Sequence, residues 1–141
     1  MRLTTPSTRS LLEQRRELSR RKRIAAGTLA NAFPQLSHLR IQLSFRDSSD
    51  RPPTRQVHEL FPPAPAFFEF PCPHGDCDGA FDLGVAVSSL LAADAPRVEG
   101  AIECPGFRTA PAAGRRPCDL EVRFLVTALY EAADATASKA R

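Results

Sequence analysis

The sequence predicts an α+β protein in which a small antiparallel sheet carries a packed helix. Residues 38–45, 98–104 and 118–130 alternate apolar and polar side chains, as half-buried strands do. Residues 7–33 and 83–91 instead place their apolar residues at helical spacing. The 141 residues, 43% of them hydrophobic, suffice for one domain with a modest core.

The first helix is expected over residues 7–33, because no proline interrupts it before Pro34. Its apolar stripe is clean from Ile24 onward. Earlier along the chain, Arg15 and Lys22 lie on the same stripe. The later half is therefore predicted to dock on the body, and the earlier half to project into solvent.

Charge is distributed unevenly along the chain. Residues 1–37 carry eight Lys and Arg against two Glu, whereas residues 38–141 carry eleven basic residues against fourteen acidic ones. A basic segment of this kind is typical of an arm that contacts nucleic acid or an acidic surface. We therefore divide the chain into a basic helical arm (1–23), a single α+β domain (24–130) and a flexible tail (131–141).

The first strand is followed by a hairpin loop and a second strand. Residues 46–55 cluster Asp, Ser and Pro, and residues 56–61 resume a strand pattern. The prolines that follow interrupt pairing, so residues 67–70 are expected as an edge strand that ends at Cys72.

Asp82 is the expected N-cap of the second helix, and a proline follows its end. Beyond that proline, residues 98–104 and 118–130 are expected to form an antiparallel hairpin, joined by a loop at 105–117.

Four cysteines stand where these elements end. Cys72 and Cys77 lie across a tight turn in which Gly75 can take an unusual backbone angle, while Cys104 ends one strand and Cys118 begins its partner. Folding thus brings two pairs of thiols together. Four thiolates are a usual ligand set of structural zinc, so we predict one zinc ion held by these four cysteines.

The turns around the cysteines resemble the knuckles of zinc-ribbon proteins. Prolines follow Cys72 and Cys104, and glycines stand at positions 75 and 106. This resemblance of pattern covers about residues 68–122 and implies a zinc site. The first pair is spaced C-x4-C where a ribbon usually has C-x2-C, so no function is transferred from any ribbon family.

Other roles for these residues stay open. The thiols could be unrelated core residues, a redox pair or a disulfide, and His74 could replace one cysteine as a ligand. Asp76 and Asp78 could act as acid and base, or could be solvated turn residues. No apolar run approaches the length of a membrane span and no signal peptide is recognised, so we expect a cytoplasmic protein, where disulfides are rare.

The basic segment RRELSRRKR, residues 15–23, is the expected contact surface. Its six basic residues are Arg15, Arg16, Arg20, Arg21, Lys22 and Arg23. They suit the tracking of phosphates, and without a helix-turn-helix pattern RNA or the ribosome is favoured over DNA. The chain has no nucleophile or nucleotide-binding motif, so a non-catalytic function is expected.

Two further hypotheses concern partners. In the first, the chain is a zinc-stabilised protein-interaction adaptor whose Leu11, Leu12 and Leu18 dock on a partner with an acidic surface. In the second, Phe67 stacks on bases beside Arg55 and Arg123 on an open sheet face.

Overall fold

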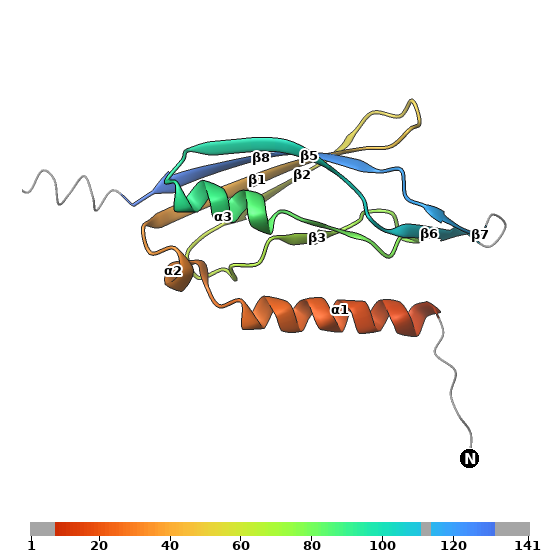
Figure 1. Cartoon of the computed structure of the whole chain (residues 1–141), viewed down its shortest axis with the longest axis horizontal. Helices are drawn as coiled ribbons and strands as arrows, with labels where there is room; N and C mark the ends of the chain where they lie inside the picture. Colours follow the sequence, from red (N-terminus) through yellow and green to blue (C-terminus); the bar gives the residue numbers. More distant parts are fainter. Residues whose placement is uncertain (1–7, 111–113, 132–141) are drawn as a thin grey trace, which may run out of the picture.

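The computed structural model describes residues 8–110 and 114–131. Its main element is a four-stranded antiparallel sheet in the order β2-β1-β8-β5 (Figure 1). The strands are β1 (Leu36–Arg46), β2 (Thr54–Leu60), β5 (Arg97–Glu103) and β8 (Glu121–Tyr130). The predicted α+β class is confirmed, and β5 pairs with β8 as the sequence predicted. Apart from Glu131, the predicted tail lies outside the described residues.

One face of this sheet forms the core. The side chains predicted to point inward on β1 and β8 are buried, and α3 (Gly84–Ala92) buries Val87, Leu90 and Leu91. The buried residues of β1 and β8 are Leu36, Leu39, Ile41, Leu43, Phe45, Val122, Phe124, Val126 and Ala128. Alternation of apolar side chains therefore drives the sheet to bury one face under the helix.

The predicted first helix divides into two. α1 (Thr8–Ala25) ends before Gly27, whose φ of 75° lies in the left-handed region, and α2 (Leu29–Ala32) follows. Thr28 caps α2 by accepting a backbone N–H with its hydroxyl. Leu29 is completely buried and anchors α2. The sequence prediction of one continuous helix was wrong because the glycine permits a sharp turn that the apolar stripe does not reveal.

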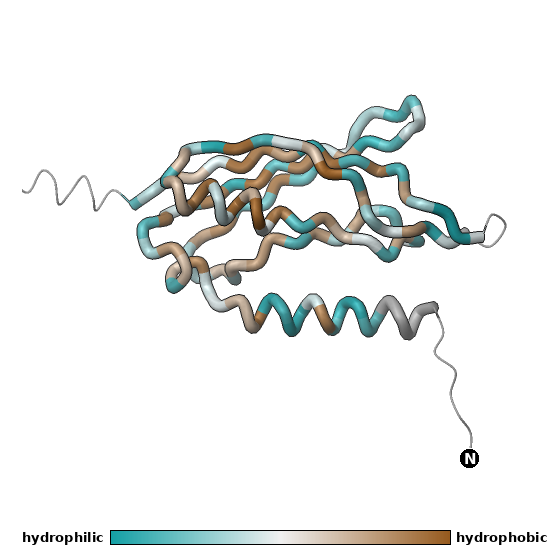
Figure 2. Tube along the Cα trace, in the orientation of Figure 1, coloured by the Kyte–Doolittle hydropathy of each residue, from teal (hydrophilic) through white to brown (hydrophobic). Residues whose placement is uncertain are grey.

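α1 lies along the body instead of projecting from it (Figure 1). The Arg15 guanidinium donates to the backbone oxygen of Asp78 at 3.0 Å. Ser19 lies 3.4 Å from a Glu69 carboxylate oxygen. The tube coloured by hydropathy shows a mainly hydrophilic helix, so polar contacts hold it (Figure 2).

Two short hairpins lie at the edge of the body nearest to α1. β3 (Glu69–Pro71) pairs with β4 (Ala80–Asp82), and β6 (Phe107–Ala110) pairs with β7 (Gly114–Pro117). The sequence predicted that residues 105–117 form a loop without strands. The structure shows that this segment contains the paired strands β6 and β7.

Asp82 ends β4 and is not the N-cap of α3. The helix begins at Gly84, with Leu83 in the N-cap position. The Asp82 side chain still accepts the Gly84 backbone N–H at 2.8 Å. The predicted residue thus supports the helix start from one position earlier in the chain.

Candidate metal centre

The four cysteines lie together at one end of the sheet. Their sulfur atoms are within 4.8 Å of one another. The Sγ atoms of Cys72 and Cys118 are 3.9 Å apart, and those of Cys77 and Cys104 are 3.6 Å apart. Tetrahedral zinc with bonds of about 2.3 Å to sulfur places neighbouring sulfurs about 3.8 Å apart. The cluster therefore fits one metal ion, and the predicted cysteines are the ones brought together.

Backbone hydrogen bonds hold the two loops that carry these thiols. The Cys77 N–H donates to the His74 oxygen at 3.2 Å and closes the first turn. The Cys118 N–H donates to the Gly106 oxygen at 3.0 Å and joins the second pair. Each sulfur position is thus set by the backbone of its own loop.

The two loops approach most closely at Gly79 and Gly106. A Cβ atom on Gly79 would lie 2.7 Å from the Cys104 sulfur and 2.7 Å from the Gly106 nitrogen. By contrast, Gly75 has no neighbour within 4 Å of such an atom, and its φ is not positive. The special backbone angle predicted for Gly75 is therefore wrong, and Gly79 is a site residue that the sequence prediction missed.

The thiols are buried, and two of them accept backbone hydrogen bonds. The Gly79 N–H donates to Cys77 Sγ at 3.3 Å, and the Gly106 N–H donates to Cys104 Sγ at 3.4 Å. Burial raises the pKa of Cys104 to about 12 and also raises the pKa of Cys72. Without a metal, Cys72 and Cys104 are therefore protonated at neutral pH, and a bound cation reverses this preference.

Asp76 and Asp78 join the first cysteine loop to β6. Asp76 accepts from the Arg108 guanidinium at 2.9 Å, and Asp78 accepts from the Phe107 N–H at 2.8 Å. The Arg108 side chain lowers the pKa of Asp76. These contacts favour a structural role for both carboxylates. The sequence alone had left open whether they act as acid and base or are solvated turn residues.

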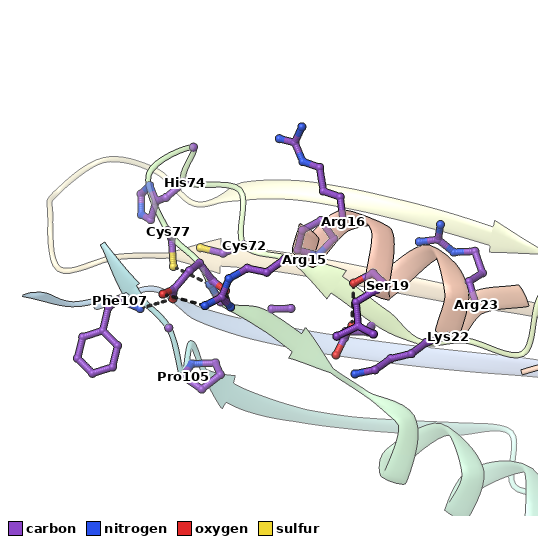
Figure 3. A pocket seen from close by; sticks show the side chains of 18 of the residues that line it. Arg15, Arg16, Ser19, Lys22, Arg23, Cys72, His74, Cys77, Pro105 and Phe107 are labelled. Carbon is purple, nitrogen blue, oxygen red and sulfur yellow. Dashed lines mark hydrogen bonds and ion pairs between the residues drawn. The ribbon is translucent and has the colours of Figure 1, made fainter. Parts of the chain in front are cut away.

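A groove of about 720 Å³ separates α1 from the cysteine loops (Figure 3). Basic side chains line it from both sides, together with Cys72, Cys77 and Phe107. Those from α1 are Arg15, Arg16, Lys22 and Arg23, and Arg115 comes from β7. The predicted basic segment and the metal centre thus face one space.

The basic residues of α1 differ in their partners. Arg15 lies 3.5 Å from a carboxylate oxygen of Asp78, and Glu17 pairs with both Arg20 and Arg21. The Arg23 guanidinium lies 5.2 Å from the centre of the Phe67 ring. Within the described part of the chain, no carboxylate pairs with Arg16 or Lys22, whose side chains are exposed.

The expected stacking site of Phe67 with Arg55 and Arg123 does not form. Arg55 and Arg123 both lie beside Ser44 in the sheet, on the face opposite to the core. Phe67 lies beneath Arg23 of α1 instead. The reason is that the residues before β3 leave the sheet and pack toward α1.

Comparison with protein-family models, with curated proteins and with solved structures gave no significant match. The zinc-ribbon resemblance therefore extends no further than the four clustered cysteines. Among the described residues, no helix is long and apolar enough to cross a membrane.

Proposed function

We propose that this chain is a non-catalytic zinc-binding protein that contacts nucleic acid through α1. One observation carries the proposal: basic residues of α1 and two of the clustered cysteines line the same groove. A rigid centre on one side and a row of cations on the other suit the binding of an extended anionic chain.

The ligand set favours zinc among the common metals. Zinc in structural sites is bound by four Cys or His ligands in a tetrahedron, and here four thiols stand at that spacing. Four thiolates fill the coordination shell, so no position is left for a substrate or an activated water. This supports a structural metal and a binding function.

The exposure of α1 supports contact with phosphates. Arg16 and Lys22 have no carboxylate partner among the described side chains, and Arg20 and Arg21 share Glu17. Guanidinium groups give bidentate contacts to phosphate. The described helices include no helix-turn-helix pair, since α2 has four residues, which favours RNA over sequence-specific DNA.

The test is fluorescence anisotropy of the zinc-loaded protein with short single-stranded RNA and DNA over a salt series. We expect affinity to fall linearly in log–log salt. The double variant Arg16→Gln/Lys22→Gln should bind more weakly, with a slope smaller by about 1.4 for two lost phosphate contacts. Arg55→Gln/Arg123→Gln removes the same charge from the open sheet face and serves as the matched control. Equal binding by both double variants would contradict the proposed surface.

The adaptor hypothesis is favoured by the apolar residues of α1. Leu18 is 53% exposed and Ile24 is 74% exposed, so the body of the protein leaves both apolar side chains largely uncovered. The side chains of Leu11 and Leu12 lie outside the described residues. If the wild-type protein binds neither RNA nor DNA, Leu18→Ser/Ile24→Ser should abolish capture of a protein partner that the wild-type chain retains.

A further inference from the structure

The sulfurs of the metal centre differ in the hydrogen bonds that they receive. Cys77 and Cys104 each accept a backbone N–H from the glycine two residues later. The backbone N–H of His74, two residues after Cys72, opposes the rise in the pKa of that thiol. Cys77 and Cys104 thus follow one pattern, in which a loop folds back so that its amide faces the sulfur, and the His74 amide acts on the pKa of Cys72 in the same direction.

Cys118 does not follow this pattern. It lies between β7 and β8, where the chain runs from one strand into the next. Within the described chain, no backbone N–H donates to its sulfur. A metal-bound thiolate carries negative charge, and a buried charged group without a hydrogen-bond donor is costly.

The side chain of His74 lies next to this sulfur. A ring nitrogen of His74, the Cys118 Sγ atom and a carboxylate oxygen of Asp119 are within 4.8 Å of one another. The Nε2 atom of His74 is buried and has no hydrogen-bond partner among the described residues. Buried polar atoms are nearly always paired, so an unpaired nitrogen on a ring that lies beside a sulfur without a backbone donor calls for a physical account.

We infer that His74 donates a ring N–H to the Cys118 thiolate when the centre holds its metal. This inference rests on the metal binding of the proposed function. A hydrogen-bond donor to a ligand sulfur spreads the negative charge of the sulfur and fixes the orientation of the ligand. Hydrogen-bond partners of metal ligands in other proteins act in the same way. His74 acts from outside the coordination shell, because the four sulfurs already stand at tetrahedral spacing without it.

The inference is tested by measuring zinc affinity against a competing chelator for the full chain and its variants. His74→Phe keeps a flat ring and removes the donor, and it should weaken zinc binding about 10-fold to 100-fold. His74→Gln keeps an N–H and should retain more of the affinity. His38→Phe changes a histidine that pairs with Glu59 on the sheet, so it should leave affinity unchanged.

Two further readouts separate a donor from a ligand and from a packing residue. The cobalt-substituted wild type and His74→Phe should both show the absorption of four thiolates. In the zinc-loaded His74→Phe, alkylation should accelerate at Cys118 and not at Cys77 or Cys104, whose sulfurs keep their backbone donors.

The outcomes are distinguishable. Unchanged zinc affinity in His74→Phe would overturn the inference and leave the metal centre intact. A cobalt spectrum of three thiolates and one imidazole, lost in His74→Phe, would make His74 a ligand and also overturn it. A wild-type chain that binds no metal would contradict the proposed function itself. Absence of nucleic-acid binding alone would leave the role of His74 standing.

Discussion

Gly79 and Gly106 touch across the metal centre, and this contact sets how closely the two cysteine loops approach. The backbone of Gly106 lies where a side chain on Gly79 would be, and the Cys104 sulfur is equally near. The four thiols therefore converge only while both positions lack a Cβ atom. A single methyl group at either position should push apart the two loops and thereby separate the thiols of Cys72 and Cys77 from those of Cys104 and Cys118.

We predict that Gly79→Ala and Gly106→Ala weaken metal binding and destabilise the fold by about 1–3 kcal/mol, the usual cost of an overpacked core. Zinc stoichiometry and thermal unfolding measure the two effects. Gly75→Ala is the matched control, because its new methyl group meets no atom within 4 Å. Equal behaviour of all three variants would show that the glycine contact does not control the centre.

The raised pKa values of Cys72 and Cys104 predict how metal binding and stability depend on pH. An unfolded cysteine titrates near pH 8.5, whereas folding raises the pKa of Cys104 to about 12. The stability that this thiol contributes to the metal-free protein is thus complete below about pH 8.5 and is lost as pH rises toward 12.

Metal uptake should show the opposite trend. The metal displaces the thiol protons, so affinity should rise with pH and binding should release protons into a weakly buffered solution. Parallel titrations of metal affinity and of metal-free unfolding check both directions. A metal affinity that is independent of pH from 6 to 8 would contradict protonated thiols in the metal-free state.

At the scale of elements, α1 differs from the rest of the fold in how it is held. Its described side chains are exposed or half-exposed, and its contacts with Asp78 and Glu69 are polar. Exposed ion pairs contribute about 0–1 kcal/mol each. α2, by contrast, buries Leu29 completely. We therefore expect that the residues before Gly27 contribute little to the stability of the fold, whereas the residues after it are needed for the core.

Removal of residues 1–25 should consequently change the free energy of unfolding by no more than about 1–2 kcal/mol, as expected for a few surface contacts. Leu29→Ala in the full chain should cost about 2–5 kcal/mol, because it leaves a cavity in the core. Chemical denaturation measures both. A truncated chain that fails to fold would contradict the view of α1 as a surface helix.

The sequence predicted the elements that are stabilised by burial and missed those that depend on chain reversal. β1 and β8 were found because their alternating residues line the core. The β6–β7 hairpin was missed because its only apolar residues apart from Pro117 are Phe107 and Ala110, which are too few to show an alternating pattern. The four clustered cysteines were predictable from residue type alone, whereas the contact of Gly79 with Gly106 is a tertiary contact that no local pattern encodes.

The whole molecule combines two ways of holding a fold. Buried apolar side chains join the four-stranded sheet to α3, and Phe45 packs against Phe81 with ring centres 5.6 Å apart. At the other end, the two cysteine loops meet through thiols, glycines and the pairs that Asp76 and Asp78 make. A metal ion bound by the four cysteines would therefore stabilise the end of the molecule where the two loops meet.

Chelation should therefore unfold one end of the molecule and spare the other. We expect amide hydrogen exchange to accelerate at residues 72–79 and 104–118, while β1 and β8 keep their protection because their core is formed without the metal. Zinc returned to the sample should restore slow exchange. Loss of protection throughout the sheet would mean that the metal is required for the whole fold. Unchanged exchange at the cysteine loops would mean that the metal has no structural role there.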